Sequence, residues 1–226
     1  GSSWADAFSS LRDALAAAQA GQEIWVAAGS YNPYVSNRAT DTFLLPSGVA
    51  LYGGFAGTES ERAERDWLAN ETILSGHIEG QTNIRHIVTA TGAEDARIDG
   101  FTIRDGHAEG ENPYADGVGA AVFVGQGEGR LTLANCRIVD NHAREGGVVY
   151  FDANANNPSL RIENTVFADN AIGSEWARGV LQIRSNAAEV WIEDSRFENN
   201  PSGIFSEAGN LQVLRSQFLA QTNIAV

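Results

Sequence analysis

The sequence predicts an all-β solenoid, in which one chain winds a single-stranded parallel β-helix of about eight coils behind an N-terminal helix. Three observations lead to this fold class. A strand–turn–strand string recurs at steps of 21 to 35 residues, a second ladder of short strands lies between its copies, and the first residues have helical periodicity instead. Repeats of about 20 to 50 residues with variable spacing are typical of solenoids, whose surface loops absorb differences in length.

The recurring string is clearest in the second half of the chain. Its third position is always aliphatic and its eighth is always large and apolar, as Phe167, Phe197 and Phe218 show in three successive copies. Five segments align without gaps, at residues 96–106, 131–141, 160–170, 190–200 and 211–221. Looser copies centre on Val26, Leu51 and Leu74. Together these copies set the expected number of coils.

The second ladder of strands lies between the copies of the string. It comprises GAAVF, GVVYF, GVLQI and GIFSE, which start at Gly119, Gly147, Gly179 and Gly203. Each coil therefore has at least two short strands, with Gly or Asn where the chain turns sharply. Stacked coils of this kind form parallel sheets around one narrow core, whereas a β-sandwich would need hairpin turns.

The opening segment has the periodicity of a helix. Its apolar residues recur at helical spacing from Trp4 to Ala18, Ser3 can cap the N-terminus with Asp6 three residues on, and Gly21 can end the helix. We expect one domain, with residues 1–22 as a cap that protects the first coil and 23–226 as the coils. A second helical piece at 58–68 is expected as a loop with a charged, solvated face.

Composition narrows the classes of partner. The net charge is −14, and all 15 basic side chains are arginine, so nucleic acid, anionic membranes and polyanionic glycans would be repelled. Neutral glycans, cations and proteins remain as possible partners. The sequence contains no run of eighteen apolar residues, so we expect no membrane-spanning helix. Cys136 is the only cysteine, which excludes an intrachain disulfide and predicts a small core residue.

Polar residues recur at two fixed positions of the string. These columns are Asn135, Asn164 and Asp194, and then Asn141, Asn170 and Asn200. Because each side chain would lie above its counterpart in the next coil, we expect ladders that satisfy the amides of the turns. The recurring acidic and amide residues therefore indicate structure rather than a carboxylate site.

The longest step, between Ile98 and Leu133, carries an insert at 104–117 that is rich in polar residues. Three interpretations compete: a solvated loop, a Ca²⁺ site made of hard oxygen ligands, and a glycan-binding or catalytic cleft. The candidate calcium or ligand residues are Asp105, Glu109, Glu111 and Asp116. The spacing matches no known calcium repeat, and no cofactor is required. The four histidines, His77, His86, His107 and His142, show no metal-ligand spacing and are expected to be structural or exposed.

Short motifs carry a family resemblance. The sequences FADN at 167–170 and FENN at 197–200, with GGVV at 146–149, resemble the F-x-x-N and G-G-A-[ILV] repeats of polymorphic outer-membrane proteins, which are adhesive surface proteins. The first part, from IWVAAGSY to LYGGFAGTE, TILSG and IDGFTI, resembles bacterial secreted right-handed parallel β-helix repeat proteins of the pectate-lyase-like superfamily. The resemblance implies right-handed coils and an extracellular or cell-surface location. IVDN and FLAQ depart from the F-x-x-N pattern.

Two functions from different classes fit these expectations. The first is a non-catalytic extracellular module, serving as a stalk, an adhesin or a carbohydrate-binding domain, with a neutral glycan or a protein receptor as partner. The second is a polysaccharide lyase or glycoside hydrolase of the pectate-lyase-like superfamily. In such lyases the resemblance implies an Arg or Lys base with acidic calcium ligands. With no lysine in the chain, Arg104 beside Asp99 and Asp105 is the best catalytic candidate.

The last residues repeat the strand pattern and then stop on the apolar sequence NIAV, with no charged or helical cap. An apolar solenoid end leaves core and strand edge exposed, so we expect the parent protein to continue or a partner to cover this end. The chain is expected to be a monomer that associates weakly through its C-terminal end.

Overall fold

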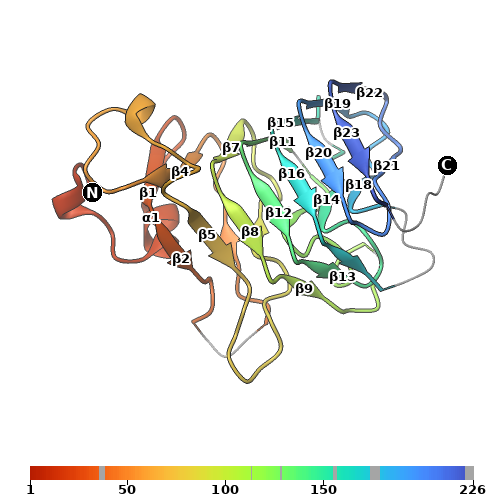
Figure 1. The fold of residues 1–226 in the computed structure, drawn as a ribbon, viewed down its shortest axis with the longest axis horizontal. Coiled ribbons are helices and arrows are strands. Elements are labelled where there is room, and N and C mark those ends of the chain that lie inside the picture. Colours follow the sequence, from red (N-terminus) through yellow and green to blue (C-terminus); the bar gives the residue numbers. More distant parts are fainter. Residues whose placement is uncertain (36–38, 113, 128, 155–156, 174–178, 222–226) are drawn as a thin grey trace.

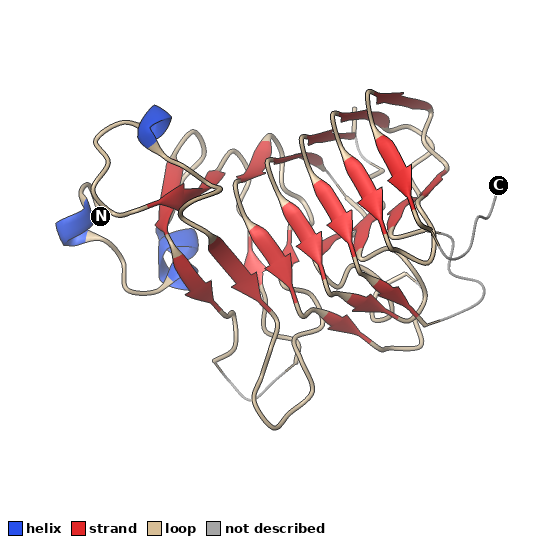
Figure 2. Ribbon diagram, in the orientation of Figure 1, coloured by secondary structure: helices blue, strands red, loops and turns tan. Residues whose placement is uncertain are grey.

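The chain forms a parallel β-helix, so the fold class expected from its repeats is confirmed (Figure 1). The computed structural model describes residues 1–35, 39–112, 114–127, 129–154, 157–173 and 179–221. Within these ranges the strands form two seven-stranded sheets, one six-stranded sheet and one three-stranded sheet. Figure 2 shows the strands stacked along one axis, with the helical segments gathered at the N-terminal end.

Each full coil passes through the sheets in a fixed order. The first sheet contains β1 (Glu23–Ala27), β4 (Ala50–Phe55), β7 (Ala96–Asp99), β11 (Arg130–Ala134), β15 (Ser159–Glu163), β19 (Glu189–Glu193) and β22 (Asn210–Leu214). The second sheet contains β2 (Gly29–Tyr31), β5 (Thr72–Ser75), β8 (Thr102–Arg104), β12 (Arg137–Val139), β16 (Val166–Ala168), β20 (Arg196–Glu198) and β23 (Gln217–Leu219).

The remaining two sheets close the coil. A short sheet contains β9 (His107–Ala108), β13 (His142–Ala143) and β17 (Ala171–Ile172). The third sheet contains β3 (Phe43–Leu44), β6 (Val88–Thr89), β10 (Val122–Val124), β14 (Val149–Phe151), β18 (Leu181–Ile183) and β21 (Ile204–Ser206). Every described pairing is parallel, because each strand lies against its counterpart in the next coil.

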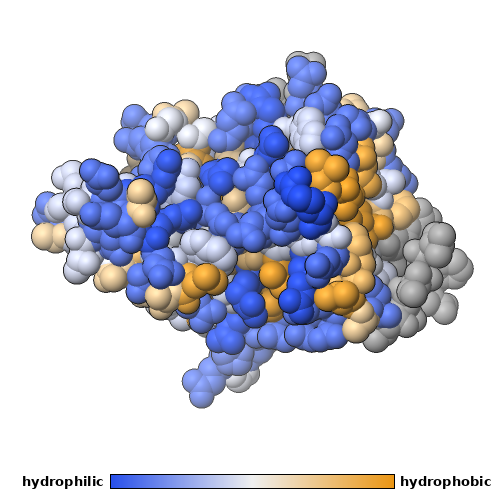
Figure 3. Space-filling view, turned by 45° about the horizontal axis from the view of Figure 1, so that its top comes forward, coloured by the Kyte–Doolittle hydropathy of each residue, from blue (hydrophilic) through white to orange (hydrophobic). Residues whose placement is uncertain are grey.

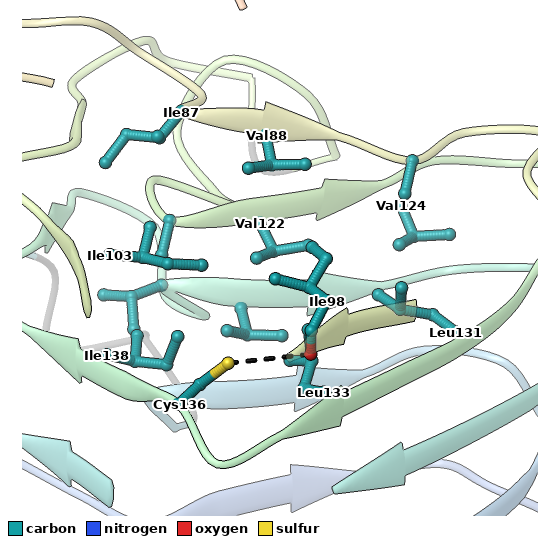
Figure 4. Packing of buried hydrophobic residues seen from close by; sticks show 14 of the residues in the cluster. Ile87, Val88, Ile98, Ile103, Val122, Val124, Leu131, Leu133, Cys136 and Ile138 are labelled. Atoms are coloured by element: carbon teal, nitrogen blue, oxygen red, sulfur yellow. Dashed lines mark hydrogen bonds between the residues drawn. The ribbon is translucent and has the colours of Figure 1, made fainter. Parts of the chain in front are cut away.

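The core is a column of aliphatic and aromatic side chains that the three long sheets enclose. Ile98 of the first sheet, Ile103 of the second and Val122 of the third are buried and pack toward one another, as Figure 4 shows. Cys136 lies in the same core, with its thiol 3.6 Å from the carbonyl oxygen of Ile98, and burial raises the pKa of this thiol to about 12. The cysteine is therefore a packing residue, as the sequence predicts.

One copy of the repeat belongs to a different sheet from the one expected. Leu74 lies on β5 of the second sheet, where it pairs with Ile103, and β4 pairs directly with β7. The chain makes an excursion over residues 56–71 between β4 and β5, and its length imitates the spacing of a whole coil. The first and second sheets therefore each have seven strands rather than eight.

The N-terminal helix is shorter than expected. The segment divides into a 3-10 turn at Trp4–Asp6 and α1 at Leu11–Ala17. The Trp4 indole donates a hydrogen bond to the carbonyl of Glu59, 2.9 Å away, so the first turn packs on the 56–71 excursion. Ser10 rather than Ser3 caps α1, by accepting from the amide of Asp13 at 3.3 Å. Leu11 and Leu15 then pack against the core, and α1 closes part of the N-terminal end.

The expected helix at 58–68 is reduced to a 3-10 turn at Arg62–Glu64. Its flank is not fully solvated, because Arg65 lies against the first sheet with a side chain that is only 12% exposed. None of the helices in the described ranges is long and apolar enough to cross a membrane.

The last described coil leaves core residues at the surface. Val213 and Phe218 are 39% and 45% exposed, whereas their partners Ile192 and Phe197 in the preceding coil are fully buried. Figure 3 shows a large hydrophobic patch at this end, with smaller ones elsewhere on the visible face. Residues 223–226, on which the expected association depends, lie outside the described residues.

Candidate functional site

The asparagine column at 141, 170 and 200 is a buried hydrogen-bonded ladder. The Asn170 side-chain oxygen accepts from the Asn141 backbone amide at 3.1 Å, and the Asn200 oxygen accepts from the Asn170 amide at 3.2 Å. The three side chains also donate to backbone carbonyls of the core strands, for example Asn170 to Ile138 at 2.8 Å. These hydrogen bonds hold the three side chains inside the turns, which supports a structural role for the column.

The second column, at Asn135, Asn164 and Asp194, lies at turns with left-handed backbone, where φ is 51°, 44° and 50°. Asn164 donates to the side-chain oxygen of Asn135 at 2.8 Å, and Asn135 donates to Asp99 at 2.8 Å. Asp194 instead accepts from Arg215. This column is therefore a partial ladder that ends on the carboxylate of Asp99.

Asp99 is the most enclosed carboxylate of the first sheet. Its side chain is 3% exposed and accepts from Arg65 at 2.6 Å, from Arg97 at 2.9 Å and from Asn135 at 2.8 Å. Burial alone would raise the pKa of Asp99, but the hydrogen bonds from Asn135, Arg65 and Arg97 more than offset it and hold the pKa below its usual range. Asp99 is thus a fixed anion whose acceptor positions are occupied.

Arg65 belongs to a clamp that holds the 56–71 excursion on the first sheet. The guanidinium groups of Arg62 and Arg65 lie 4.7 and 5.1 Å from the ring centre of Tyr52. Arg62 donates to the Tyr52 hydroxyl at 3.1 Å and pairs with Glu23. Arg65 also donates to the Gly53 carbonyl at 3.0 Å. The clamp covers the N-terminal part of this face and leaves the later strands open.

An outward-facing row continues across the open strands. We define the outer row as Arg97, Thr132, Arg161 and Trp191, which lie in register on β7, β11, β15 and β19. The Arg161 guanidinium lies 5.6 Å from the ring centre of Trp191. Glu163 accompanies the row, 2.6 Å from Arg161 and 3.5 Å from Arg97. Cationic, hydroxyl and aromatic groups thus follow one another along the solenoid axis.

A groove of about 300 Å³ lies beside the outer row. It is lined by Ala50, Asp95, Ala96, Arg97, Arg130, Leu131, Thr132 and Ser159. Arg130 is held by Asp95 at 2.8 Å and by Glu94 at 3.0 Å. Because both arginines of the groove are paired with carboxylates, the groove is polar but nearly neutral.

The catalytic candidates inferred from the sequence do not converge. Asp105 occupies a left-handed turn with φ of 66°, the same turn position as Asp140 and Asp169 in later coils, and it accepts from Ser75 at 3.1 Å. Arg104 lies on the second sheet, 3.5 Å from Asp105, whereas Asp99 lies on the first. Asp105 is thus part of the repeat rather than a specialised residue of the insert.

The calcium candidates likewise face different partners. Asp105 bonds Ser75, Glu111 lies 3.6 Å from Arg144, and Asp116 lies 2.7 Å from Arg85. Only Glu109 belongs to a group of three possible metal ligands within the described residues. The four carboxylates therefore have no common centre there.

The partners of Glu109 are two histidines that sequence reasoning treated as scattered. The Nε2 atoms of His107 and His142 lie 3.2 and 2.6 Å from one oxygen of Glu109. Burial lowers the pKa of His142, and Glu109 only partly offsets this effect. The repeat could have predicted this proximity. The sequences D-G-H-A at 105–108 and D-N-H-A at 140–143 place both histidines at the same position of neighbouring coils.

His86, unlike His107 and His142, has a structural role. Its ring packs at a tilt of 30° against Phe123 with centres 4.7 Å apart, and Nδ1 lies 3.1 Å from the Gly119 carbonyl, so Nδ1 carries the proton. Burial lowers the pKa of His86 to about 4. The insert also exposes Tyr114, whose ring lies 5.3 Å from the Arg184 guanidinium. Neither residue lies on the outer row.

The molecule is thus a parallel β-helix with two candidate sites: the outer row on the first sheet, and the group of His107, Glu109 and His142 at the short sheet. The chain belongs to the right-handed β-helix family: the family model described as a right-handed beta helix region matches residues 70–218. A solved structure of a pectin methylesterase variant in complex with a hexasaccharide is similar, with 14% identity and a TM-score of 0.38, over 94% of this chain and 86% of that chain. Among curated proteins, none matches the sequence.

Proposed function

We propose that the chain is a non-catalytic module that binds a neutral oligosaccharide along the outer row of the first sheet. The observation that carries this proposal is the register of Arg97, Thr132, Arg161 and Trp191 on four successive strands. Parallel strands lie about 4.8 Å apart, so the row spans roughly 14 Å along the solenoid axis. A site of this form suits an extended, polymeric ligand.

The chemistry of the row supports a sugar. An indole such as Trp191 offers a flat apolar surface to the apolar face of a sugar ring, while its polar surroundings fix the orientation. The hydroxyls of Thr132 and Ser159 and the guanidinium of Arg97 line the adjoining groove and can bond to sugar hydroxyls. Because Arg97 and Arg161 are already paired with carboxylates, a neutral ligand is favoured over an acidic one.

The state of Asp99 supports binding without catalysis. A general acid needs a carboxyl group whose pKa is raised toward the working pH, and a nucleophile needs an unoccupied oxygen. Asp99 has the opposite properties, since three donors occupy its carboxylate and lower its pKa. Arg104, the other candidate, lies on a different sheet. The proposal includes an extracellular location, as the resemblance to secreted β-helix proteins implies.

Calorimetry with a panel of neutral oligosaccharides and matched uronate oligosaccharides tests the proposal. We expect a neutral oligosaccharide to bind, Trp191→Ala to weaken binding by roughly tenfold or more, and Tyr114→Ala, an exposed aromatic of the insert, to leave it unchanged. Assays for reducing ends and unsaturated products should remain negative. Equal binding by the Trp191 variant would refute the site, and turnover of any oligosaccharide would favour the lyase or hydrolase alternative.

A further inference from the structure

Two imidazoles and a carboxylate converge on the short sheet, on a different side of the coil from the outer row. His107 on β9 and His142 on β13 are register partners, and their rings stack with centres 4.8 Å apart. Glu109 follows His107 by two residues, so its carboxylate returns to the same side of the strand. One of its oxygens faces the Nε2 atoms of both rings, at 3.2 and 2.6 Å.

The spacing of these three atoms fits a small cation. In a tetrahedral zinc site, nitrogen and oxygen ligands at about 2.0 to 2.2 Å from the ion lie about 3.3 Å from one another. The ligand atoms of His107, Glu109 and His142 all lie within 4.8 Å of one another, with two of the separations at 3.2 and 2.6 Å. A bound ion would take the place of the two direct contacts between the imidazole nitrogens and the Glu109 oxygen.

We propose that His107, Glu109 and His142 form a binding site for a divalent transition-metal ion of the Zn²⁺ type. Two neutral imidazoles and one carboxylate suit zinc and its neighbours, whereas Ca²⁺ and Mg²⁺ require sets of oxygen ligands. The side chains are 36%, 47% and 29% exposed, so an ion can enter from solvent and keep water at its remaining positions.

The surroundings leave room for the ion. A Cβ atom at Gly173, in the next coil, would lie 3.3 Å from His142 Nε2 and 3.2 Å from the Cα of Arg144, so the glycine keeps this approach open. Arg144, two residues after His142, lies 3.6 Å from Glu111 and 3.4 Å from Glu145, which offset its charge. Ala171 occupies the histidine position in the following coil, so the ligand set is confined to two coils.

A metal bound here would join two neighbouring coils by their side chains. Because the ligands come from β9, from the residues after it and from β13, the folded chain binds the ion and the unfolded chain does not hold the same geometry. Binding therefore stabilises the fold, and the melting temperature should rise with metal concentration. The site is separate from the outer row, so oligosaccharide binding and metal binding can succeed or fail independently.

Calorimetry of the full chain, without a histidine tag, against ZnCl₂ tests this site, and Co²⁺ absorption reports the coordination geometry. We expect one Zn²⁺ per chain, at least tenfold weaker binding in His107→Gln, Glu109→Gln and His142→Gln, and no binding in the double histidine variant. His77→Gln, an exposed histidine elsewhere, and Glu111→Gln, another acid of the insert, are matched controls that should bind as the wild type does.

Three results would overturn the metal site. These are no heat with Zn²⁺ and no rise in melting temperature, unchanged affinity in the His142 and Glu109 variants, or Ca²⁺ binding as tightly as Zn²⁺. Melting of the metal-free variants checks that they fold, because the loss of an exposed His–Glu contact should shift the melting temperature little.

Discussion

Replacing Phe197 with alanine removes the middle ring of a three-ring stack in the core. Phe197 is fully buried and lies between Phe167 and Phe218, with ring centres 4.6 and 4.8 Å away and interplanar angles of 5° and 10°. Burial of a phenylalanine and the cavity left by its loss amount to about 3 to 5 kcal/mol. Each stacked pair adds about 0.5 to 1.5 kcal/mol, part of which is included in that range.

Phe218→Ala serves as the matched comparison, because it belongs to the same column but is 45% exposed and has one stacked neighbour. We expect its loss of unfolding free energy to be about 1.5 to 2.5 kcal/mol, roughly half of the fully buried value. Urea unfolding followed by tryptophan fluorescence measures both. A loss below about 1 kcal/mol for Phe197→Ala, or equal losses for both variants, would refute the register of the second sheet.

The remaining predictions concern buried polar groups. Asn170→Ala leaves a buried amide without its acceptor and should cost about 1 to 3 kcal/mol in urea unfolding, with oligosaccharide binding unchanged. Asp99→Asn weakens a buried ion pair and should cost up to about 3 to 5 kcal/mol at pH 7. Burial lowers the pKa of His86 to about 4, so wild-type stability should fall between pH 6.5 and 4, by at most about 3 kcal/mol, and His86→Gln should remove this dependence.

Each of these variants has an internal check. Asn164→Gly keeps the left-handed turn and removes one exposed hydrogen bond, so a loss as large as that of Asn170→Ala would contradict the buried ladder. The lowered pKa of Asp99 means that its contribution is present above about pH 4 and is lost as the pH falls further. The His86 effect comes at higher pH, because its imidazole is neutral when folded and the unfolded chain binds the proton first. An unchanged pH profile in His86→Gln would show that other groups dominate.

The register of the later coils could be predicted because the string is short, ungapped and periodic. The position shared by Ile103, Ile138 and Phe167 forms one column in the structure, as the alignment requires. The same reasoning failed at the 56–71 excursion, because the length of this loop is close to the spacing of one coil. Leu74 was therefore assigned to the first sheet, whereas it pairs with Ile103 in the second. Repeat spacing counts residues, and it does not distinguish a strand ladder from a loop of equal length.

The candidate sites were less accessible to sequence reasoning. The alignment of the repeats could have predicted that His107 and His142 are neighbours, because both occupy the same position in successive coils. The number of residues between the two histidines along the chain does not show this. The environment of Asp99 could not be predicted, because Arg65 reaches it from the excursion and only the folded path of that loop brings the two together.

The position of a bound oligosaccharide tests the central claim most directly. A crystal structure with the neutral oligosaccharide that binds most tightly should show the ligand along the outer row, with a sugar ring on Trp191 and hydroxyls near Thr132 and Arg97. A ligand on the insert or on the third sheet, or a panel in which no neutral oligosaccharide binds, would contradict the proposed function.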